Sequence, residues 1–321
     1  MLRILSGARR STARHLTLLV ACSALAACSA PRPIGPQPLP PEIARPTSSV
    51  HYRDYDSADD LAAALRWTER APVLVSAHRG GPTPGFPENA IETFENALNF
   101  APTLIEMDVR ATADGRLVLL HDETLDRTTT GTGRLDTTPF VAVRALRLLA
   151  DDGTLTSYRV PTLDEALAWA EGRAVLVLDA KSDVEPRALV EAVRRLRAED
   201  RVVVITYSAE SVATYRRIAP ELVLSISAGT PAEARAALAA SDPDRVIAFV
   251  GVGAADPATV AVFHAAGVRV QAGAFGAIDE AAEAPGGWTA YRALLDAGVD
   301  TIASDNVPAA AIAAQQASMR R

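Results

Sequence analysis

The feature of this sequence that most constrains its fold is a regular alternation of short β-branched runs with amphipathic segments. Nine runs have the length and the valine and isoleucine content of buried strands, and helical patterns fall between most of them. The runs are residues 73–77, 104–109, 117–121, 174–180, 202–207, 222–227, 245–250, 268–273 and 300–304. Repeated βα units of this kind predict a (β/α)8 TIM-type barrel, with a doubly wound open sheet as the alternative.

Nine strands are one more than such a barrel uses. The second and third runs are joined only by RATADGR, residues 110–116, whose Asp114-Gly115 pair is typical of a hairpin turn. We therefore expect one of these runs to be an antiparallel addition or a short piece outside the barrel.

The N-terminal segment is typical of a secretory signal. A cationic stretch precedes the apolar run LTLLVACSALAA at residues 16–27, which is too short to remain as a membrane span. The run ends in Leu-Ala-Ala-Cys, which resembles the bacterial lipobox, in which the cysteine becomes the first residue of the mature chain and carries lipid. We predict a signal peptide at 1–27 and a lipidated Cys28, with a simple small-residue cleavage site as the alternative. Ser29 after this cysteine, rather than aspartate, resembles lipoproteins that are passed on to the outer membrane, which implies a location on the periplasmic side of the cell envelope.

The remaining chain divides into a tether and one domain. Residues 28–50 are rich in proline and predict an extended tether, and residues 51–321 form the predicted barrel domain, beginning with a helix within 51–70 that Ser57 caps. Only two cysteines occur, Cys22 and Cys28, so the domain has no disulfide. The net charge of −7 provides no basic surface for nucleic acid.

Acidic side chains occur on two of the predicted strands. Glu106 and Asp108 alternate with apolar residues, so a period of two places both carboxylates on one face. Asp179 and Lys181, the single lysine of the chain, show the same spacing after another apolar run. Neighbouring carboxylates repel unless a positive group lies between them, and a divalent cation with oxygen ligands would meet that need. The alternative is a solvated strand end whose acids pair with arginines.

Two of the five histidines, His78 and His121, end predicted strands. In a barrel of this class the carboxyl ends of the strands carry the catalytic groups. Arg79 follows His78 directly, so two imidazoles, three carboxylates, one guanidinium and one ammonium share the same predicted rim. Burying so many charges without a ligand would be costly, which favours a functional site over packing.

The order of several short motifs resembles that of the glycerophosphodiester phosphodiesterase family, in its bacterial lipoprotein form. The motifs are His78-Arg79-Gly80, Pro87-Glu88-Asn89, the segment IEMDVRATADGRLVLLHDETLDRTTTGTG and the later LDAK. The resemblance runs from about residue 73 to the C-terminus and is densest up to Lys181. It implies a (β/α)8 barrel with an insertion, here about 122–163, after the strand that carries His121.

The resemblance also implies roles for these residues. Glu106, Asp108 and Asp179 would bind one divalent cation, Ca²⁺ or Mg²⁺, and Arg79 and Lys181 would neutralise the phosphate. His78 and His121 would divide the general base and general acid work, with Glu88 and Asn89 in support. The substrate is expected to be a small glycerophosphodiester, cleaved to glycerol 3-phosphate and an alcohol, and either water or a substrate hydroxyl serves as the nucleophile. Gly80 and Gly81 are expected to let the substrate approach the backbone.

The sequence departs from the family pattern at several positions. Asp179 occupies a position where the family commonly has glutamate, and Phe275 is the candidate for an aromatic wall beside the glycerol. Asp305, in SDNVP, is expected to brace the barrel rather than take part in the reaction. A phospholipase D of the sphingomyelinase type and a binding lipoprotein without activity are the alternative functions, and the oligomeric state is left open.

Overall fold

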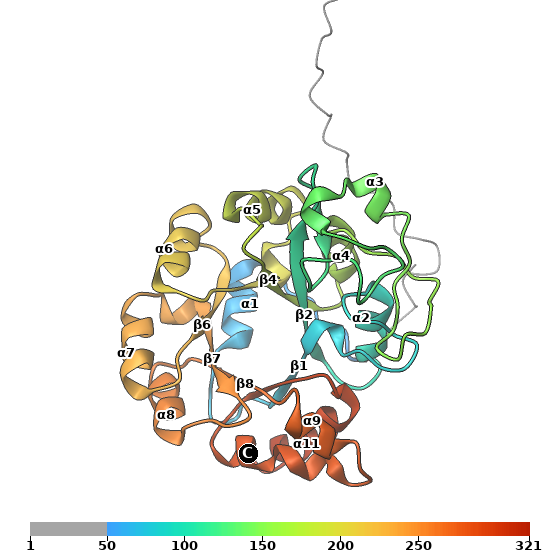
Figure 1. Ribbon diagram of the computed structural model, residues 1–321. Coiled ribbons are helices and arrows are strands. Elements are labelled where there is room, and N and C mark those ends of the chain that lie inside the picture. Colours follow the sequence, from blue (N-terminus) through green and yellow to red (C-terminus); the bar gives the residue numbers. More distant parts are fainter. Residues whose placement is uncertain (1–49) are drawn as a thin grey trace, which may run out of the picture. The chain divides into compact units, whose positions relative to one another are not determined.

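Eight parallel strands close into a barrel in this computed structural model, which describes residues 50–321. The predicted signal peptide, Cys28 and the tether up to residue 49 lie outside the described residues. Neighbours follow the order β1-β9-β8-β7-β6-β5-β4-β2, and the pairing of β1 with β2 completes the ring (Figure 1). The barrel strands are β1 Leu74–Ala77, β2 Thr103–Ala111, β4 Val175–Ala180, β5 Val202–Ile205, β6 Val223–Ser227, β7 Val246–Val252, β8 Val270–Gly273 and β9 Thr301–Ser304. The predicted barrel is therefore confirmed, and the open sheet is wrong.

The ninth strand is an antiparallel addition. β3, Leu117–Leu119, pairs with the end of β2 through Val109, Arg110 and Ala111, and it does not join the ring. The third of the nine predicted runs is therefore the additional antiparallel strand, as the Asp114-Gly115 turn led us to expect. β3 ends at Leu119, however, so His121 lies two residues beyond the strand that was predicted to carry it.

Helices surround the strands, and their starts follow from local sequence. Four of them, α5, α7, α8 and α11, have proline in their first turn, where its missing N–H group costs nothing. A capping box of Thr162 and Glu165 begins α4. The helices are α1 Ala58–Leu65, α2 Ile91–Ala97, α3 Phe140–Val143, α4 Leu163–Ala170, α5 Pro186–Arg195, α6 Ala209–Ile218, α7 Pro231–Ala239, α8 Pro257–Ala265, α9 Ala277–Ala282, α10 Arg292–Asp296 and α11 Val307–Ser318. Within residues 50–321, no helix is both long and apolar enough to cross a bilayer.

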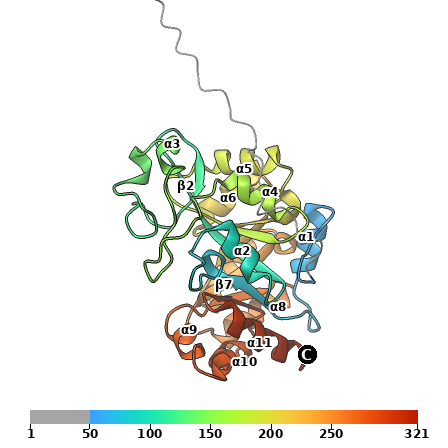
Figure 2. The ribbon, with the colours of Figure 1, turned by 90° about the vertical axis from the view of Figure 1, so that its right-hand side faces the viewer.

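The two ends of the barrel are closed by different elements (Figure 2). Helix α1, capped by Ser57 as predicted, covers one end and packs Leu61 and Leu65 against the interior residues Val177 and Val203. The segment between β3 and α4 carries α3 at the opposite end and has an apolar cluster of its own around Leu125. The carboxyl ends of the parallel strands, where the predicted site residues lie, therefore face this second segment.

Candidate active site

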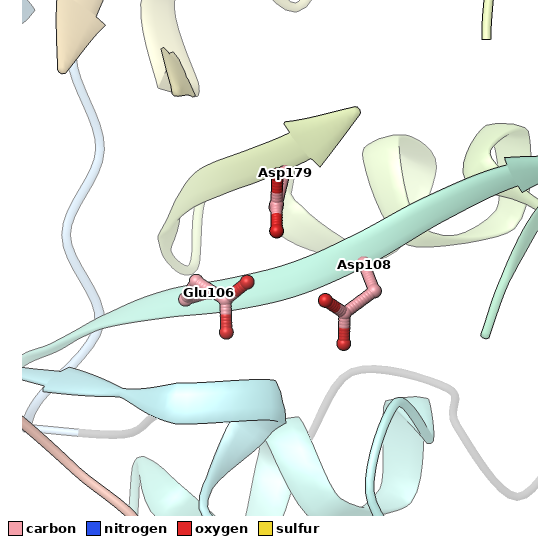
Figure 3. Close-up of side chains that lie close together, drawn as sticks. All are labelled: Glu106, Asp108 and Asp179. Carbon is pink, nitrogen blue, oxygen red and sulfur yellow. The ribbon is translucent and has the colours of Figure 1, made fainter. Parts of the chain in front are cut away.

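Three carboxylates meet where β2 and β4 run side by side. The backbone of Asp108 on β2 is in register with that of Asp179 on β4, and Glu106 lies two residues before Asp108 on the same face. One oxygen of each of the three lies within 4.8 Å of the others. Figure 3 shows the three side chains gathered at the two strands. All three residues are buried, with at most 6% of their surface exposed. The predicted cluster is therefore present, and the parallel register of two strands builds it.

The protein compensates these three negative charges only in part. Asp108 accepts hydrogen bonds from Asn89 Nδ2 at 2.8 Å and pairs with Lys181 Nζ at 2.7 Å. Burial alone would raise the pKa of Asp108, but Lys181 and Asn89 outweigh burial and lower it. No lysine or arginine side chain of residues 50–321 forms an ion pair with Glu106, and burial and the adjacent Asp108 outweigh His78 and the Arg79 N–H and raise its pKa to about 8. Negative charge at Glu106 is thus disfavoured in the protein alone.

One oxygen of the cluster is buried without a partner. Asp179 Oδ2 accepts from Lys181 Nζ at 2.5 Å, but Asp179 Oδ1 has no hydrogen-bond partner among the described residues. A buried carboxylate oxygen that is left unpaired is costly and rare. Carboxylates that converge within 4.8 Å, one with an unpaired oxygen, are the donors that a hard divalent cation such as Ca²⁺ or Mg²⁺ prefers. The residues present therefore fit such an ion.

Arg79 is held in a strained backbone conformation beside this cluster. Its φ of 52° lies in the left-handed region, and so does the φ of 57° at Asn89. Such residues cost about 1–3 kcal/mol each and persist where their surroundings hold them. Here the Arg79 N–H donates to Glu106 Oε2 at 2.7 Å, and the Asn89 N–H donates to the Arg79 carbonyl at 2.9 Å. The strain places the Arg79 side chain against Glu88, whose carboxylate accepts from Nη1 at 2.9 Å.

The two glycines after Arg79 have a packing role. Both have a positive φ, which glycine adopts without penalty. A Cβ at Gly80 would overlap the ring of Phe94, and a Cβ at Gly81 would overlap Val307. The turn that carries His78 and Arg79 therefore requires glycine because of its neighbours, and the expected close approach of substrate is not needed to explain these positions.

His78 is oriented by a carboxylate from the last strand of the barrel. Its Nδ1 lies 2.8 Å from Asp305 Oδ1, one residue beyond β9, and the imidazole stacks on Phe275 at 4.3 Å between ring centroids. Burial alone would lower the pKa of His78, but the hydrogen bond that its Nδ1 donates to Asp305 and the charge of Glu106 raise this pKa above its ordinary value. Phe275, the candidate for an aromatic wall beside the glycerol, thus packs on His78 and lines the cavity there. Asp305, expected to brace the barrel, contacts a site histidine directly.

His121 has the same arrangement as His78. Its Nδ1 lies 2.8 Å from Asp122 Oδ1, so a carboxylate accepts the Nδ1 proton of each imidazole. This leaves Nε2 of each ring as the nitrogen for proton transfer. Two imidazoles oriented in this way, together with the cations of Arg79 and Lys181, are suited to acid–base chemistry on an anionic substrate.

Two residues of the site, Arg127 and Tyr207, were not identified from the sequence. Arg127 contacts both Glu88 and Asp122, although it appears in the sequence only as one letter of the RTTTGTG stretch. Tyr207 ends the predicted strand 202–207, and its side chain reaches the rim. Desolvation and then the negative charge of Asp179 raise the pKa of its hydroxyl. Tyr207 lies at a period of two after the inward-facing Val203 and Ile205, and this spacing could have pointed to it. Arg127 lies in an irregular segment without such a period.

A cavity of about 940 Å³ opens beside His78 and Arg79. Phe275 and Arg127 form part of its wall, and Asp151 and Glu280 lie farther along it. Cavities of this size are typical of small-molecule sites. The cavity is thus large enough for a small molecule to reach His78 and Arg79.

Comparison with known proteins agrees with this geometry. The sequence profile of the Glycerophosphoryl diester phosphodiesterase family matches residues 78–309. A probable glycerophosphodiester phosphodiesterase 2 of Mycobacterium tuberculosis is 30% identical over 77% of this chain and 93% of its own length. A glycerophosphodiester phosphodiesterase of Caldanaerobacter subterraneus is 32% identical over 48% of this chain, and the match spans just under two thirds of that relative, 66%.

The fold agrees as well. The crystal structure of a glycerophosphoryl diester phosphodiesterase from Parabacteroides distasonis superposes with a TM-score of 0.77 at 31% identity. The superposition covers 83% of this chain and 94% of that one.

Proposed function

Because this chain belongs to the glycerophosphoryl diester phosphodiesterase family, we propose that it hydrolyses glycerophosphodiesters to glycerol 3-phosphate and an alcohol. The observation that carries the proposal is the buried cluster of Glu106, Asp108 and Asp179 with an unpaired oxygen, next to two carboxylate-oriented histidines. A cluster of this kind is suited to a cation and a phosphate together.

The acidic cluster is the proposed cation site. Glu106, Asp108 and Asp179 would hold one Ca²⁺ or Mg²⁺. When bound, the ion supplies Lewis-acid polarisation of a non-bridging phosphate oxygen. It also offsets the repulsion that raises the pKa of Glu106.

The remaining residues have separate tasks. Arg79 and Lys181 place positive charge near the phosphate and stabilise the additional charge of the transition state. One of His78 and His121 accepts a proton from the nucleophile through Nε2, and the other donates a proton to the leaving alcohol. Asp305 and Asp122 each hold an imidazole with Nδ1–H toward the carboxylate. Water or a neighbouring substrate hydroxyl acts as the nucleophile.

The test is product analysis with the purified full chain. With Ca²⁺ or Mg²⁺ present, glycerophosphocholine should yield glycerol 3-phosphate and choline, and His78→Ala and His121→Ala should abolish the reaction. A parallel arm offers sphingomyelin and phosphatidylcholine vesicles. Turnover of the vesicles without turnover of glycerophosphocholine would contradict the proposal and favour a lipid phosphodiesterase of the phospholipase D type.

We also propose that the chain is a lipoprotein of the cell envelope, anchored through Cys28. This proposal is supported by the sequence of residues 1–50 alone. In a bacterial host, mass spectrometry of the mature N-terminus should find diacylglyceryl-modified Cys28, and Cys28→Ala should leave the precursor unprocessed. An unmodified N-terminus generated at another residue would contradict the anchor.

A further inference from the structure

Arg127 joins two carboxylates that belong to different segments of the chain. Its Nε and Nη2 donate to Asp122 Oδ2 and Oδ1 at 2.7 and 2.9 Å. Its Nη1 and Nη2 donate to Glu88 Oε2 and Oε1, both at 2.9 Å. One guanidinium thus forms two bidentate pairs, the geometry in which arginine binds carboxylates most strongly.

Each of these carboxylates also contacts a residue of the candidate site. Asp122 Oδ1 accepts from His121 Nδ1 at 2.8 Å, and Glu88 Oε2 accepts from Arg79 Nη1 at 2.9 Å. His121 lies in the segment after β3, whereas Arg79 lies in the turn after β1. Arg127 therefore connects these two parts of the site directly through its side chain.

We infer that Arg127 is a positioning residue of the proposed hydrolase, which orients His121 through Asp122 and Arg79 through Glu88. The inference rests on the proposed function for its assay. Catalytic groups must be held within a fraction of an ångström of their working geometry, and neighbouring hydrogen bonds provide this support.

The charges on either side of Arg127 explain why it is needed. Glu88 is only 4% exposed, and Arg79 and Arg127 are its two ion-pair partners among the described residues. Without Arg127, the whole charge of Glu88 would act on Arg79 and hold it away from a phosphate. The hydrogen bonds from Arg127 also keep the pKa of Asp122 well below its usual range, so this carboxylate remains ionised toward His121.

Lysine cannot replace Arg127 in this arrangement. A single ammonium has no planar fork and cannot form two bidentate pairs at once. Four of the five guanidinium N–H donors of Arg127 are already used by Glu88 and Asp122. A group with its donors engaged in this way is suited to orienting neighbours, so its loss should lower kcat more than it raises KM.

Arg134 offers a matched control. It lies in the same segment, forms a bidentate pair with Asp136 and donates to Glu123 at 2.9 Å. Within residues 50–321, neither of these carboxylates hydrogen-bonds or ion-pairs with a residue of the candidate site. Both arginines therefore bridge two carboxylates and are similarly exposed, at 44% and 52% of the side chain. They differ in that Glu88 is buried whereas the partners of Arg134 are exposed, and in that only the partners of Arg127 contact the site.

The first measurement is steady-state hydrolysis of glycerophosphocholine by the full chain and its variants. Arg127→Ala should lower kcat about 100-fold with KM changed by no more than about twofold, the size expected of a displaced catalytic group. The kcat of Arg127→Lys should exceed that of Arg127→Ala by less than about tenfold, because lysine restores the positive charge but not the planar set of guanidinium donors. Arg134→Ala should have the kcat of the parent. An increase in KM alone, or equal losses at both arginines, would overturn the inference.

A double-mutant cycle tests the route of the effect. If Arg127 acts in part through Asp122, Arg127→Ala should cost clearly less in an Asp122→Asn background than in the parent. Losses that simply multiply would show that the two residues act independently. If Arg127→Ala does not fold, Arg127→Lys can replace it in the cycle with Asp122→Asn.

The position of His121 can be read without turnover. The ¹⁵N chemical shifts of its imidazole report the Nδ1 hydrogen bond, and they should change in Arg127→Ala and stay unchanged in Arg134→Ala. A parent protein that does not hydrolyse glycerophosphocholine would contradict the proposed function alone, and the imidazole spectrum would then decide the role of Arg127. Unchanged His121 shifts in Arg127→Ala would overturn it.

Discussion

Both ends of the barrel bury carboxylates, but they compensate them differently. At the end that α1 covers, Asp300 is fully buried and contacts His264 Nε2 at 2.7 Å, the Val270 N–H at 3.0 Å and Arg321 Nη2 at 2.9 Å. At the opposite end, Asp179 keeps one buried oxygen unpaired, and burial beside Asp108 raises the pKa of Glu106 to about 8.

The contrast separates charges that serve the fold from charges that serve a ligand. Around Asp300 the protein places a basic side chain against each carboxylate oxygen, His264 at Oδ2 and Arg321 at Oδ1, although Oδ1 makes no hydrogen bond within the described residues. In the cluster of Glu106 and Asp179, one buried carboxylate oxygen has no partner within the described residues. Such an unpaired oxygen costs stability, and it is a common feature of functional sites. Changes at the α1 end should therefore affect stability, and changes at the other end should affect activity.

The largest expected effect is on the two site histidines. His78→Ala and His121→Ala should each lower kcat by about 10²–10⁴-fold, the usual contribution of general acid–base catalysis. The melting temperature should change little, because both imidazoles are partly exposed at the rim. Kinetics and thermal unfolding on the same samples check this expectation, and loss of activity only in parallel with unfolding would break the contrast.

His264 at the α1 end should behave in the opposite way. His264→Ala removes a hydrogen-bond partner of the buried Asp300, and leaving a buried polar group without its partner costs about 1–3 kcal/mol. It also removes the stacking partner of Trp67. Urea unfolding should show this loss of stability, whereas kcat of the folded protein should match that of the parent. A His264→Ala variant with full stability would show that the two ends are not compensated differently.

Cation binding should stabilise the parent protein through the acidic cluster. At a Ca²⁺ concentration 100 times its Kd, a ligand that binds only the folded state adds about 2.7 kcal/mol. Glu106→Gln removes the negative charge of one of the three ligands, so Ca²⁺ should stabilise this variant much less than the parent. In EDTA the variant should remain folded. Thermal unfolding with EDTA and with added Ca²⁺ measures both values. Equal stabilisation of parent and variant would place the cation elsewhere.

The smallest predicted effect concerns the pH profile. Asp305 raises the pKa of His78 against the effect of burial, so Asp305→Asn leaves burial dominant and lowers that pKa. The limb of the pH–rate profile that reports His78 should therefore move to lower pH, with a fall in kcat of about tenfold, or 1.4 kcal/mol in the barrier. The limb that moves also identifies His78 as the base or the acid. An unchanged profile would remove Asp305 from the site.

The success of the sequence predictions follows from periodicity. The period of two in strand residues identified Glu106 and Asp108, and the expectation that parallel strands end at one edge brought Asp179 to them. The contact of Asp305 with His78 was not predicted, because the two residues are 227 positions apart and meet only where β9 closes the ring onto β1. Arg127 lies in an irregular segment with no period, so only coordinates show that it bridges two carboxylates.

The most direct test of this account is a Ca²⁺ and Mg²⁺ titration of the EDTA-treated full chain, with calorimetry and glycerophosphocholine turnover followed in parallel. The account predicts one binding site, turnover that returns in proportion to its occupancy, and loss of both in Glu106→Gln. Turnover that persists in EDTA, or binding that Glu106→Gln leaves intact, would contradict the claim that the three buried carboxylates are built to hold a cation.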